Sequence, residues 1–155
     1  MFLYLMRHGE AVKAGGEIRS DAERALTEYG RMQVRTIAQE LKRRRISAGV
    51  VSSPYLRAVQ TAEILVNEIG TMTLTKDPDL ASTGHAPDLA ALLKRHSGVQ
   101  NLILVGHQPD IGMLVEQIIG FELGFGTAVL AGFESGAEQK WRYLWSLIPE
   151  DLFHK

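Results

Sequence analysis

MFLYLMRHGE, residues 1–10, decides the fold, because an apolar run of six residues stops abruptly at charge and glycine. Such a run predicts a buried strand that delivers its last residues to the molecular surface. The delivered residues are Arg7 and His8, followed by Gly9. A neutral imidazole is a competent nucleophile, and a guanidinium binds a phosphoryl group well. The pair suggests phosphoryl transfer to His8, although a histidine after a strand can also be a plain loop residue.

The composition is that of an ordinary globular protein. Of 155 residues, 45% are hydrophobic and 23% are charged, which predicts one domain over residues 1–155. A formal net charge of −1 gives no general attraction to nucleic acid or to an anionic membrane. Without cysteine the chain has no disulfide, thiol nucleophile or thiolate metal site. The N-terminal apolar run is too short to span a membrane, and no basic segment precedes it, so we expect a cytoplasmic protein.

Strand and helix patterns alternate along the rest of the chain. We expect strands at Gly49 to Ser52, Met72 to Thr75, Asn101 to Val105, Thr127 to Phe133 and Trp141 to Leu147. We expect helices from Thr27 to about Arg44, from Ser53-Pro54 to Ile69, and beginning at Pro87 and Pro109. This alternation predicts a three-layer α/β domain, with a mostly parallel central sheet, an antiparallel edge strand and helices on both faces.

The last predicted strand carries three alternating aromatic residues, Trp141, Tyr143 and Trp145. An alternation of this kind is typical of a half-buried antiparallel strand. We therefore do not interpret these rings as a platform for stacking nucleic-acid bases.

Polar residues follow three of the predicted strands. His8 follows the first strand, Ser52-Ser53 closes the second, and His107 follows the strand from Asn101. In α/β sheets, ligands bind beyond the carboxyl ends of the strands, where helix N-termini also favour anions. Arg57 lies early in the helix after Ser53 and points back toward that edge. We therefore expect four residues to meet around one anion: Arg7, His8, Arg57 and His107.

Each of these residues also has a structural interpretation. Arg57 could be a surface residue paired with Glu63 or Asp79, and His107 could cap a helix. Glu10 fits an orienting or structural carboxylate better than a catalytic acid. A metal site on the two histidines is disfavoured, because the adjacent arginines would repel a cation. We expect neither a metal nor another cofactor.

Four segments together resemble the histidine phosphatase superfamily, which includes the cofactor-dependent phosphoglycerate mutases. They are Arg7-His8-Gly9-Glu10, Ala25-Leu26-Thr27 with Gly30, Ser52 to Ala58 with Gln60-Thr61-Ala62, and Gly106-His107 with Pro109. The short chain and its sequence through Pro149 are similar to the phosphohistidine phosphatases of the SixA type. The resemblance implies a phosphoglycerate mutase-like fold.

The resemblance also implies a role for each matched residue. His8 is then the nucleophile that takes the phosphoryl group, Arg7 and Arg57 hold its oxygens, and His107 completes the pocket. Gly9 lets the backbone approach the phosphate closely.

Two departures from the wider family bear on the substrate. The alignment puts Ser82 where larger relatives carry a Glu or Asp general acid, with Asp79 nearby. A neutral imidazole, whose conjugate acid has a pKa near ~6.5, leaves far more readily than an alkoxide and tolerates the missing acid. The short stretch from Ile69 to Pro87 leaves no room for a substrate-covering subdomain, so the site is open to a side chain on a folded protein.

These features predict a metal-independent phosphohistidine protein phosphatase that forms a covalent phosphohistidine on His8. Its partner would be a phosphotransfer domain or a phosphocarrier, with no nucleic acid or membrane involved. Hydrolysis of small phosphomonoesters and non-catalytic binding of phosphohistidine are the alternatives. The sequence leaves open the oligomeric state and whether Ser20, Arg24 or Asp79 takes part in the site.

Overall fold

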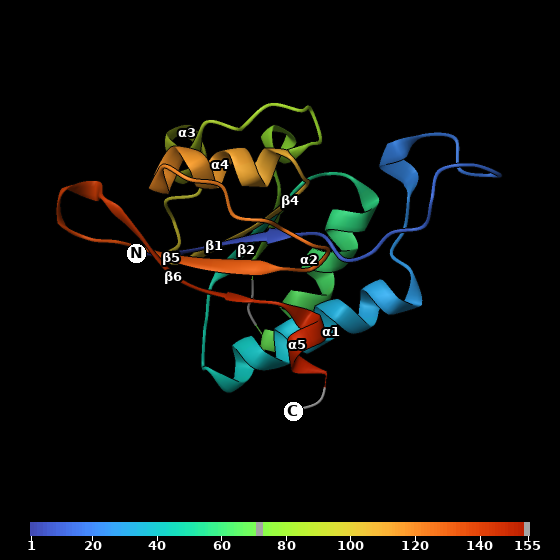
Figure 1. Cartoon of the computed structure of the whole chain (residues 1–155), viewed down its shortest axis with the longest axis horizontal. Helices are drawn as coiled ribbons and strands as arrows, with labels where there is room; N and C mark the ends of the chain where they lie inside the picture. The colour runs from blue at the N-terminus through green and yellow to red at the C-terminus, as the bar shows by residue number, and fades with distance from the viewer. Residues whose placement is uncertain (71–72, 154–155) are drawn as a thin grey trace.

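A six-stranded sheet in the order β3-β2-β4-β1-β5-β6 forms the middle of the molecule, whose computed structural model describes residues 1–70 and 73–153 (Figure 1). The strands are β1 Phe2–Arg7, β2 Gly49–Ser52, β3 Leu74–Lys76, β4 Leu102–Gly106, β5 Leu130–Ser135 and β6 Trp141–Leu147. The pairs β2–β3, β2–β4 and β1–β4 are parallel, and β5 is antiparallel to both β1 and β6. The predicted, mostly parallel sheet is confirmed. The antiparallel strand is β5, which lies next to the edge strand β6.

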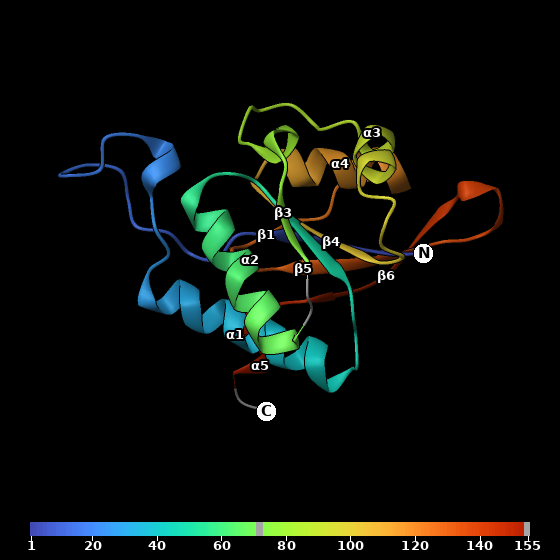
Figure 2. The same ribbon diagram turned by 180° about the vertical axis from the view of Figure 1, so that it is seen from behind.

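Helices cover both faces of the sheet, which confirms the three-layer prediction. The helices α1 Glu28–Arg43, α2 Leu56–Ile69 and α5 Pro149–Leu152 pack on one face, and α3 Leu89–Arg95 and α4 Asp110–Ile119 on the other (Figures 1 and 2). Strand β1 serves both cores, because Tyr4 and Met6 point to the first face and Leu3 and Leu5 to the second. None of the helices in the described ranges combines the length and apolarity that a membrane crossing requires.

Helices α2 and α3 and strand β5 begin at least two residues later than the sequence predicts. Helix α2 begins at Leu56 rather than at Ser53-Pro54, because the Ser53 hydroxyl accepts the Tyr55 N–H at 3.2 Å in a turn that precedes the helix. Helix α3 begins at Leu89, where the side chain of Asp88 caps it. Strand β5 begins three residues after Thr127, because Ala128 has a φ of 59° and donates its N–H to the carbonyl of His8. The strand predicted from Met72 to Thr75 corresponds to β3, which begins at Leu74. Met72 itself lies outside the described residues.

The alternation of aromatic residues in β6 does not place them all on one face. The register shifts between Gly132 and Phe133, so that Tyr143 pairs with Phe133 and Trp145 with Gly132. Trp145 packs on the α1 side, with its ring centroid 5.8 Å from that of Tyr4, whereas Trp141 packs on the α3–α4 side. The prediction of a half-buried antiparallel strand is confirmed, and the bulge, which adds one residue, turns Trp145 to the opposite face from Trp141.

Candidate active site

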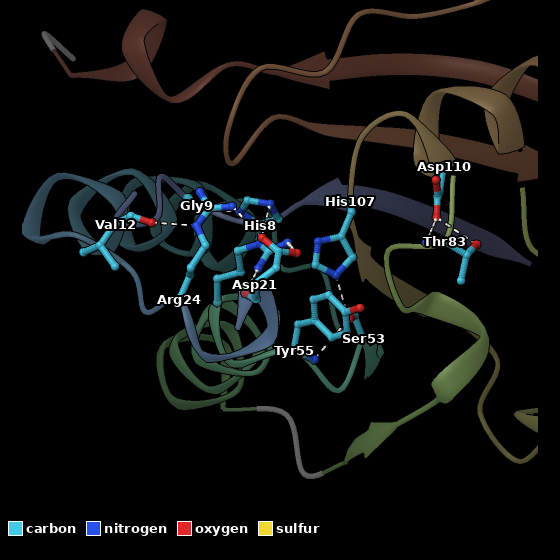
Figure 3. A network of polar contacts seen from close by, with 11 residues as sticks. His8, Gly9, Val12, Asp21, Arg24, Ser53, Tyr55, Thr83, His107 and Asp110 are labelled. Atoms are coloured by element: carbon cyan, nitrogen blue, oxygen red, sulfur yellow. Dashed lines mark hydrogen bonds and ion pairs between the residues drawn. The ribbon is translucent and has the colours of Figure 1, made fainter. Parts of the chain in front are cut away.

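Three neighbouring strands end at the same level and bring their next residues together. Arg7 pairs with Gly106 across β1 and β4, and Ser52 pairs with Val105 across β2 and β4. The ladder then continues past the strands, because the His8 N–H donates to the Gly106 carbonyl at 3.1 Å and the Ser53 N–H to the Val105 carbonyl at 2.9 Å. As predicted, the chain places His8, Ser53 and His107 at one edge of the sheet (Figure 3).

The hydrogen bonds of His8 fix which ring nitrogen carries the proton. Its Nδ1 lies 2.7 Å from the Gly9 carbonyl oxygen, which only accepts, so Nδ1 is the protonated nitrogen. The Arg57 Nε–H, which only donates, lies 3.2 Å from Nε2, so Nε2 carries the lone pair. The ring is 6% exposed, and burial together with the charges of Arg57 and Arg7 lowers the pKa of His8 to about 4. His8 is therefore a neutral imidazole at neutral pH, and its unprotonated Nε2 accepts the Arg57 Nε–H.

Arg57 is held by Asp21, a residue that the sequence did not single out. The guanidinium is 3% exposed, and its Nη1 donates to the Asp21 carbonyl oxygen at 2.7 Å and its Nη2 to the Asp21 Oδ2 at 2.9 Å. The suggested surface pairing with Asp79 was wrong, because Asp79 pairs with Arg95 at 2.6 Å. Asp21 opens a short helix 36 residues before Arg57, too far along the chain for a spacing pattern to link the two. The sequence offered one hint, because Asp21 lies three positions before Arg24, a spacing at which the two side chains can pair.

Arg24 joins the same network, which answers one question that the sequence left open. Its Nη1 donates to the Asp21 Oδ1 at 2.8 Å, and its Nε donates to the Val12 carbonyl at 2.7 Å. Its charge is one of the influences that lower the pKa values of His8 and Arg7. Ser20, in contrast, precedes the short helix at Asp21–Glu23 without a side-chain hydrogen bond to it.

Arg7 presents one nitrogen without a partner. Its Nη1 donates to the Phe125 carbonyl at 3.0 Å, while its buried Nε has no hydrogen-bond partner among the described residues. Burial, followed by the charges of Arg57 and Arg24, lowers the pKa of Arg7. A guanidinium pKa lowered from above 12 still leaves a cation at neutral pH. Arg7 therefore offers a charged donor to an anion.

His107 lies beside the His8 ring, with 5.1 Å between the ring centroids (Figure 3). It is 1% exposed, and burial first, then the neighbouring His8 and Arg57, lowers its pKa to about 3. Its Nε2 lies 2.7 Å from the Ser53 hydroxyl, which already accepts the Tyr55 N–H and can donate its own proton to Nε2. In that arrangement the buried Nδ1, which has no partner among the described residues, carries the ring proton. His107 then offers a neutral N–H donor.

Gly9 contacts helix α1, Thr61 of helix α2 and the ring of His8. Its N–H donates to the Thr61 hydroxyl at 3.1 Å and its carbonyl accepts from His8, so its amide already has a partner. A Cβ on Gly9 would lie 2.8 Å from the Gly30 carbonyl oxygen, so the glycine allows the close approach of α1. Glu10 is a structural carboxylate, because it accepts the hydroxyl proton of Thr27, the residue that caps α1, at 3.0 Å.

The position expected to carry a general acid is built differently. Beside Ser82, the Thr83 N–H donates to the Asp110 Oδ2 at 3.0 Å, so the buried Asp110 anchors this segment (Figure 3). No sequence pattern pointed to Asp110. Its Oδ1 has no hydrogen-bond partner among the described residues. Among all the residues that the structure describes, no group of three or more His, Cys, Asp or Glu side chains is arranged to hold a metal ion.

The arrangement as a whole is suited to phosphoryl transfer. A neutral, lone-pair-bearing nitrogen lies next to a buried guanidinium, with a second guanidinium and a neutral imidazole close by. Fixed donors of this kind stabilise the equatorial oxygens of a transferring phosphoryl group.

A family model agrees with this chemistry. The model described as histidine phosphatase superfamily (branch 1) matches residues 3–85 of the chain. The protein belongs to this superfamily and is built as a phosphatase.

Within the superfamily, the most informative similarities are to SixA proteins. The solved protein histidine phosphatase SixA in complex with tungstate has a TM-score of 0.86 at 26% identity, covering 98% of this chain and 99% of that one. A putative phosphohistidine phosphatase SixA from Agrobacterium tumefaciens has a TM-score of 0.82 at 26% identity, covering 96% and 98%. A SixA homologue of Haemophilus influenzae is 31% identical over 133 residues, covering 77% of this chain and 78% of its own length. An uncharacterised protein of Picosynechococcus is 37% identical over 145 residues, covering 88% and 87%.

Proposed function

We propose that this phosphatase removes the phosphoryl group from a phosphohistidine on a partner protein, through a phosphohistidine formed on its own His8. The observation that carries the proposal is the state of the His8 ring. Its Nε2 is unprotonated, buried and 3.2 Å from the Nε of a fixed guanidinium. A nucleophile of this kind needs no base to activate it.

In the first step, the lone pair of His8 Nε2 attacks phosphorus and forms a P–N bond. The P–N bond of the substrate breaks in line with the attack, and its electron pair passes to the substrate nitrogen. When the other nitrogen of the substrate ring carries a proton, the leaving group is a neutral imidazole and needs no acid. The side chains of Arg7, Arg57 and His107 stabilise the negative charge on the phosphoryl oxygens.

In the second step, water attacks the phosphoryl group on His8 and the P–N bond of the enzyme breaks. The Gly9 carbonyl, 2.7 Å from Nδ1, keeps the proton on the far nitrogen of His8. His8 therefore leaves as a neutral imidazole, by the same logic that applies to the substrate. One hydrogen bond thus makes His8 both a nucleophile and a leaving group.

The substrate class is supported by the position of the carboxylates. Ser82 stands where larger relatives carry the general acid, and Asp79 is paired with Arg95. Neither residue is therefore suited to donate a proton to an alkoxide leaving group, as hydrolysis of a phosphomonoester requires. The SixA proteins to which this chain is similar are named as phosphatases of phosphohistidine or of protein histidine. The partner we propose is a phosphotransfer domain or a phosphocarrier that presents its phosphohistidine on the surface.

The decisive experiment follows a radiolabelled phosphate from a histidine-phosphorylated protein. The wild-type protein is expected to release inorganic phosphate and, on rapid quenching in alkali, to carry an acid-labile label on His8. The His8→Ala variant is expected to show neither release nor label. The exposed His85 gives the matched control, because His85→Ala is expected to behave as wild type.

Three results would contradict the proposal in different ways. Release at the wild-type rate by His8→Ala would remove the covalent step. Faster turnover of a small phosphomonoester than of the phosphohistidine protein would favour a metabolite phosphatase. Tight binding of the phosphohistidine protein without release of phosphate would indicate a binding module.

A further inference from the structure

Tyr55 lies against two residues of the phosphate pocket but takes no part in the steps above. Its ring packs edge-on against His107, with centroids 5.1 Å apart and an angle of 61° between the planes. The guanidinium carbon of Arg57 lies over the same ring, 5.2 Å from its centroid. His107 and Arg57 are almost fully buried, whereas Tyr55 is partly exposed. Tyr55 therefore lies on the more exposed side of the candidate site, and we call this side its rim.

The backbone around Tyr55 fixes the position of this ring. Tyr55 is the extended residue immediately before helix α2, and its N–H is bound by the Ser53 hydroxyl. Ser53 in turn contacts Nε2 of His107 at 2.7 Å. The ring is thus placed by the same short segment that orients His107, and this ties its position to that of the phosphate pocket.

The direction of the reaction brings the leaving group to this rim. Attack by His8 from inside the pocket places the leaving group on the opposite side of phosphorus. The substrate would reach the phosphoryl position from that side, because His8, Arg57 and His107 are buried and Tyr55 is partly exposed. A leaving group bound to a phosphoryl between Arg57 and His107 comes next to the ring that contacts both.

We propose that Tyr55 is a specificity-determining residue that recognises the imidazole ring of the substrate's phosphohistidine. The inference rests on the proposed function. The reactive form of the substrate carries a proton on its second ring nitrogen, so its ring is a flat cation until the P–N bond breaks. An aromatic face attracts such a cation, and the guanidinium of Arg57 already lies over the same Tyr55 ring. Substrates without a ring gain nothing from this contact.

The test compares two substrates that have the same P–N bond. One is a histidine-phosphorylated peptide, and the other is phosphoramidate, which has no ring. Tyr55→Leu is expected to lower kcat/KM for the peptide about tenfold and to change that for phosphoramidate by less than about twofold. Tyr55→Phe keeps the aromatic face and is expected to retain both activities. Leu56→Ala, at the exposed neighbouring position, is the matched control and is expected to retain both.

Inhibition by orthovanadate reports whether the phosphate pocket is intact in each variant, and an unchanged inhibition constant is expected for Tyr55→Leu. If that variant does not fold, Tyr55→Met takes its place with the same expectation. An equal loss on both substrates, with weaker vanadate binding, would mean that Tyr55 only supports His107 and would overturn the inference while the proposed function stands. Unchanged activity on both substrates would overturn it as well. A wild-type protein that hydrolyses phosphoramidate but no phosphohistidine would overturn the proposed function and the inference together.

Discussion

At the level of single residues, the site depends on where one proton resides. The Gly9 carbonyl holds it on Nδ1 of His8, and the Arg57 Nε–H confirms the lone pair on Nε2. Burial, together with the charges of Arg57, Arg7 and Arg24, then lowers the pKa of His8 to about 4, so the ring does not take up a second proton at neutral pH. In the proposed mechanism, the backbone and the neighbouring charges thus make His8 a neutral nucleophile that needs no catalytic base.

Asp21 is expected to be a positioning residue for Arg57. An Asp21→Asn variant loses the charge that binds both Arg57 and Arg24, so Arg57 is less firmly held beside His8. We expect kcat/KM for a phosphohistidine protein to fall about tenfold, the usual consequence of losing a charged hydrogen bond. The measurement is steady-state release of phosphate, with orthovanadate inhibition to show that the oxyanion pocket has weakened too.

Glu23 provides the control for this variant, because it lies in the same short helix and accepts the Arg19 N–H at an exposed position. Glu23→Gln is expected to retain wild-type activity. An increase in activity for Asp21→Asn would contradict the positioning role, since it would mean that Asp21 withholds Arg57 from the substrate.

The residues that could be predicted are those that follow strands. Arg7, His8 and His107 stand directly at strand ends, and the rule for parallel sheets was enough to bring them together. Asp21 could not be found in this way, because its segment has no periodic pattern and its partner is far away in the chain. Asp110 was not predicted for a different reason, because an acidic residue at the start of a helix is ordinarily interpreted as a cap.

At the level of elements, helix α1 is locked to the loop after β1 by the close contact at Gly30. A Cβ at Gly30 would overlap the carbonyl oxygen of Glu10, whereas one at the exposed Gly98 would meet nothing within 4 Å. Gly30→Ala is expected to reduce the free energy of unfolding by about 2–3 kcal/mol, because backbone must move to admit the methyl group. Gly98→Ala is expected to change it by less than about 0.5 kcal/mol.

Urea denaturation of the two variants measures this difference. Because Glu10 follows the nucleophile by two residues, Gly30→Ala is also expected to lower phosphatase activity in the folded protein. Equal stability of the two variants would show that the loop can move away from α1 without cost.

Element types were predictable, but their exact ends were not. The apolar periodicity of α1 and the apolar runs of β1, β2 and β4 are long enough to identify each element. The start of α2 depended on a serine side chain that binds the chain two residues later, and the facing of β6 depended on a bulge. Both are contacts that form only in the folded chain.

At the level of the whole molecule, the two buried histidines make stability depend on pH. The pKa values of His8 and His107 fall from about 6.5 in the unfolded chain to about 4 and about 3. Below pH 6.5 the unfolded chain therefore binds protons that the folded protein excludes. The free energy of unfolding is expected to fall as pH decreases from 6.5 toward 4.5, with a slope of about 1.4 kcal/mol per pH unit for each imidazole.

Urea titrations at pH 7, 6 and 5 test this expectation. Carboxyl groups whose pKa is lowered, such as Asp77 and Glu40, contribute mainly below their unfolded values near ~4. The pH range in which these carboxyl groups affect stability thus lies below the range in which the two histidines do. His107→Gln removes one of the two imidazoles and is expected to reduce the slope by about half. A slope that is the same in the variant and in the wild type would show that His107 does not contribute.

The backbone of His8 is tied on both sides of its strand, and this limits how the reaction can proceed. Its N–H is bound to Gly106 of β4 and its carbonyl to Ala128 before β5. In the proposed reaction, the ring of His8 therefore stays in place while the phosphorus atom moves from the substrate nitrogen to Nε2. Under this proposal, a donor histidine has to extend its whole side chain from the partner's surface to meet that fixed point, so a phosphohistidine recessed in a cleft is out of reach. How far a histidine protrudes thus becomes a criterion for choosing partners.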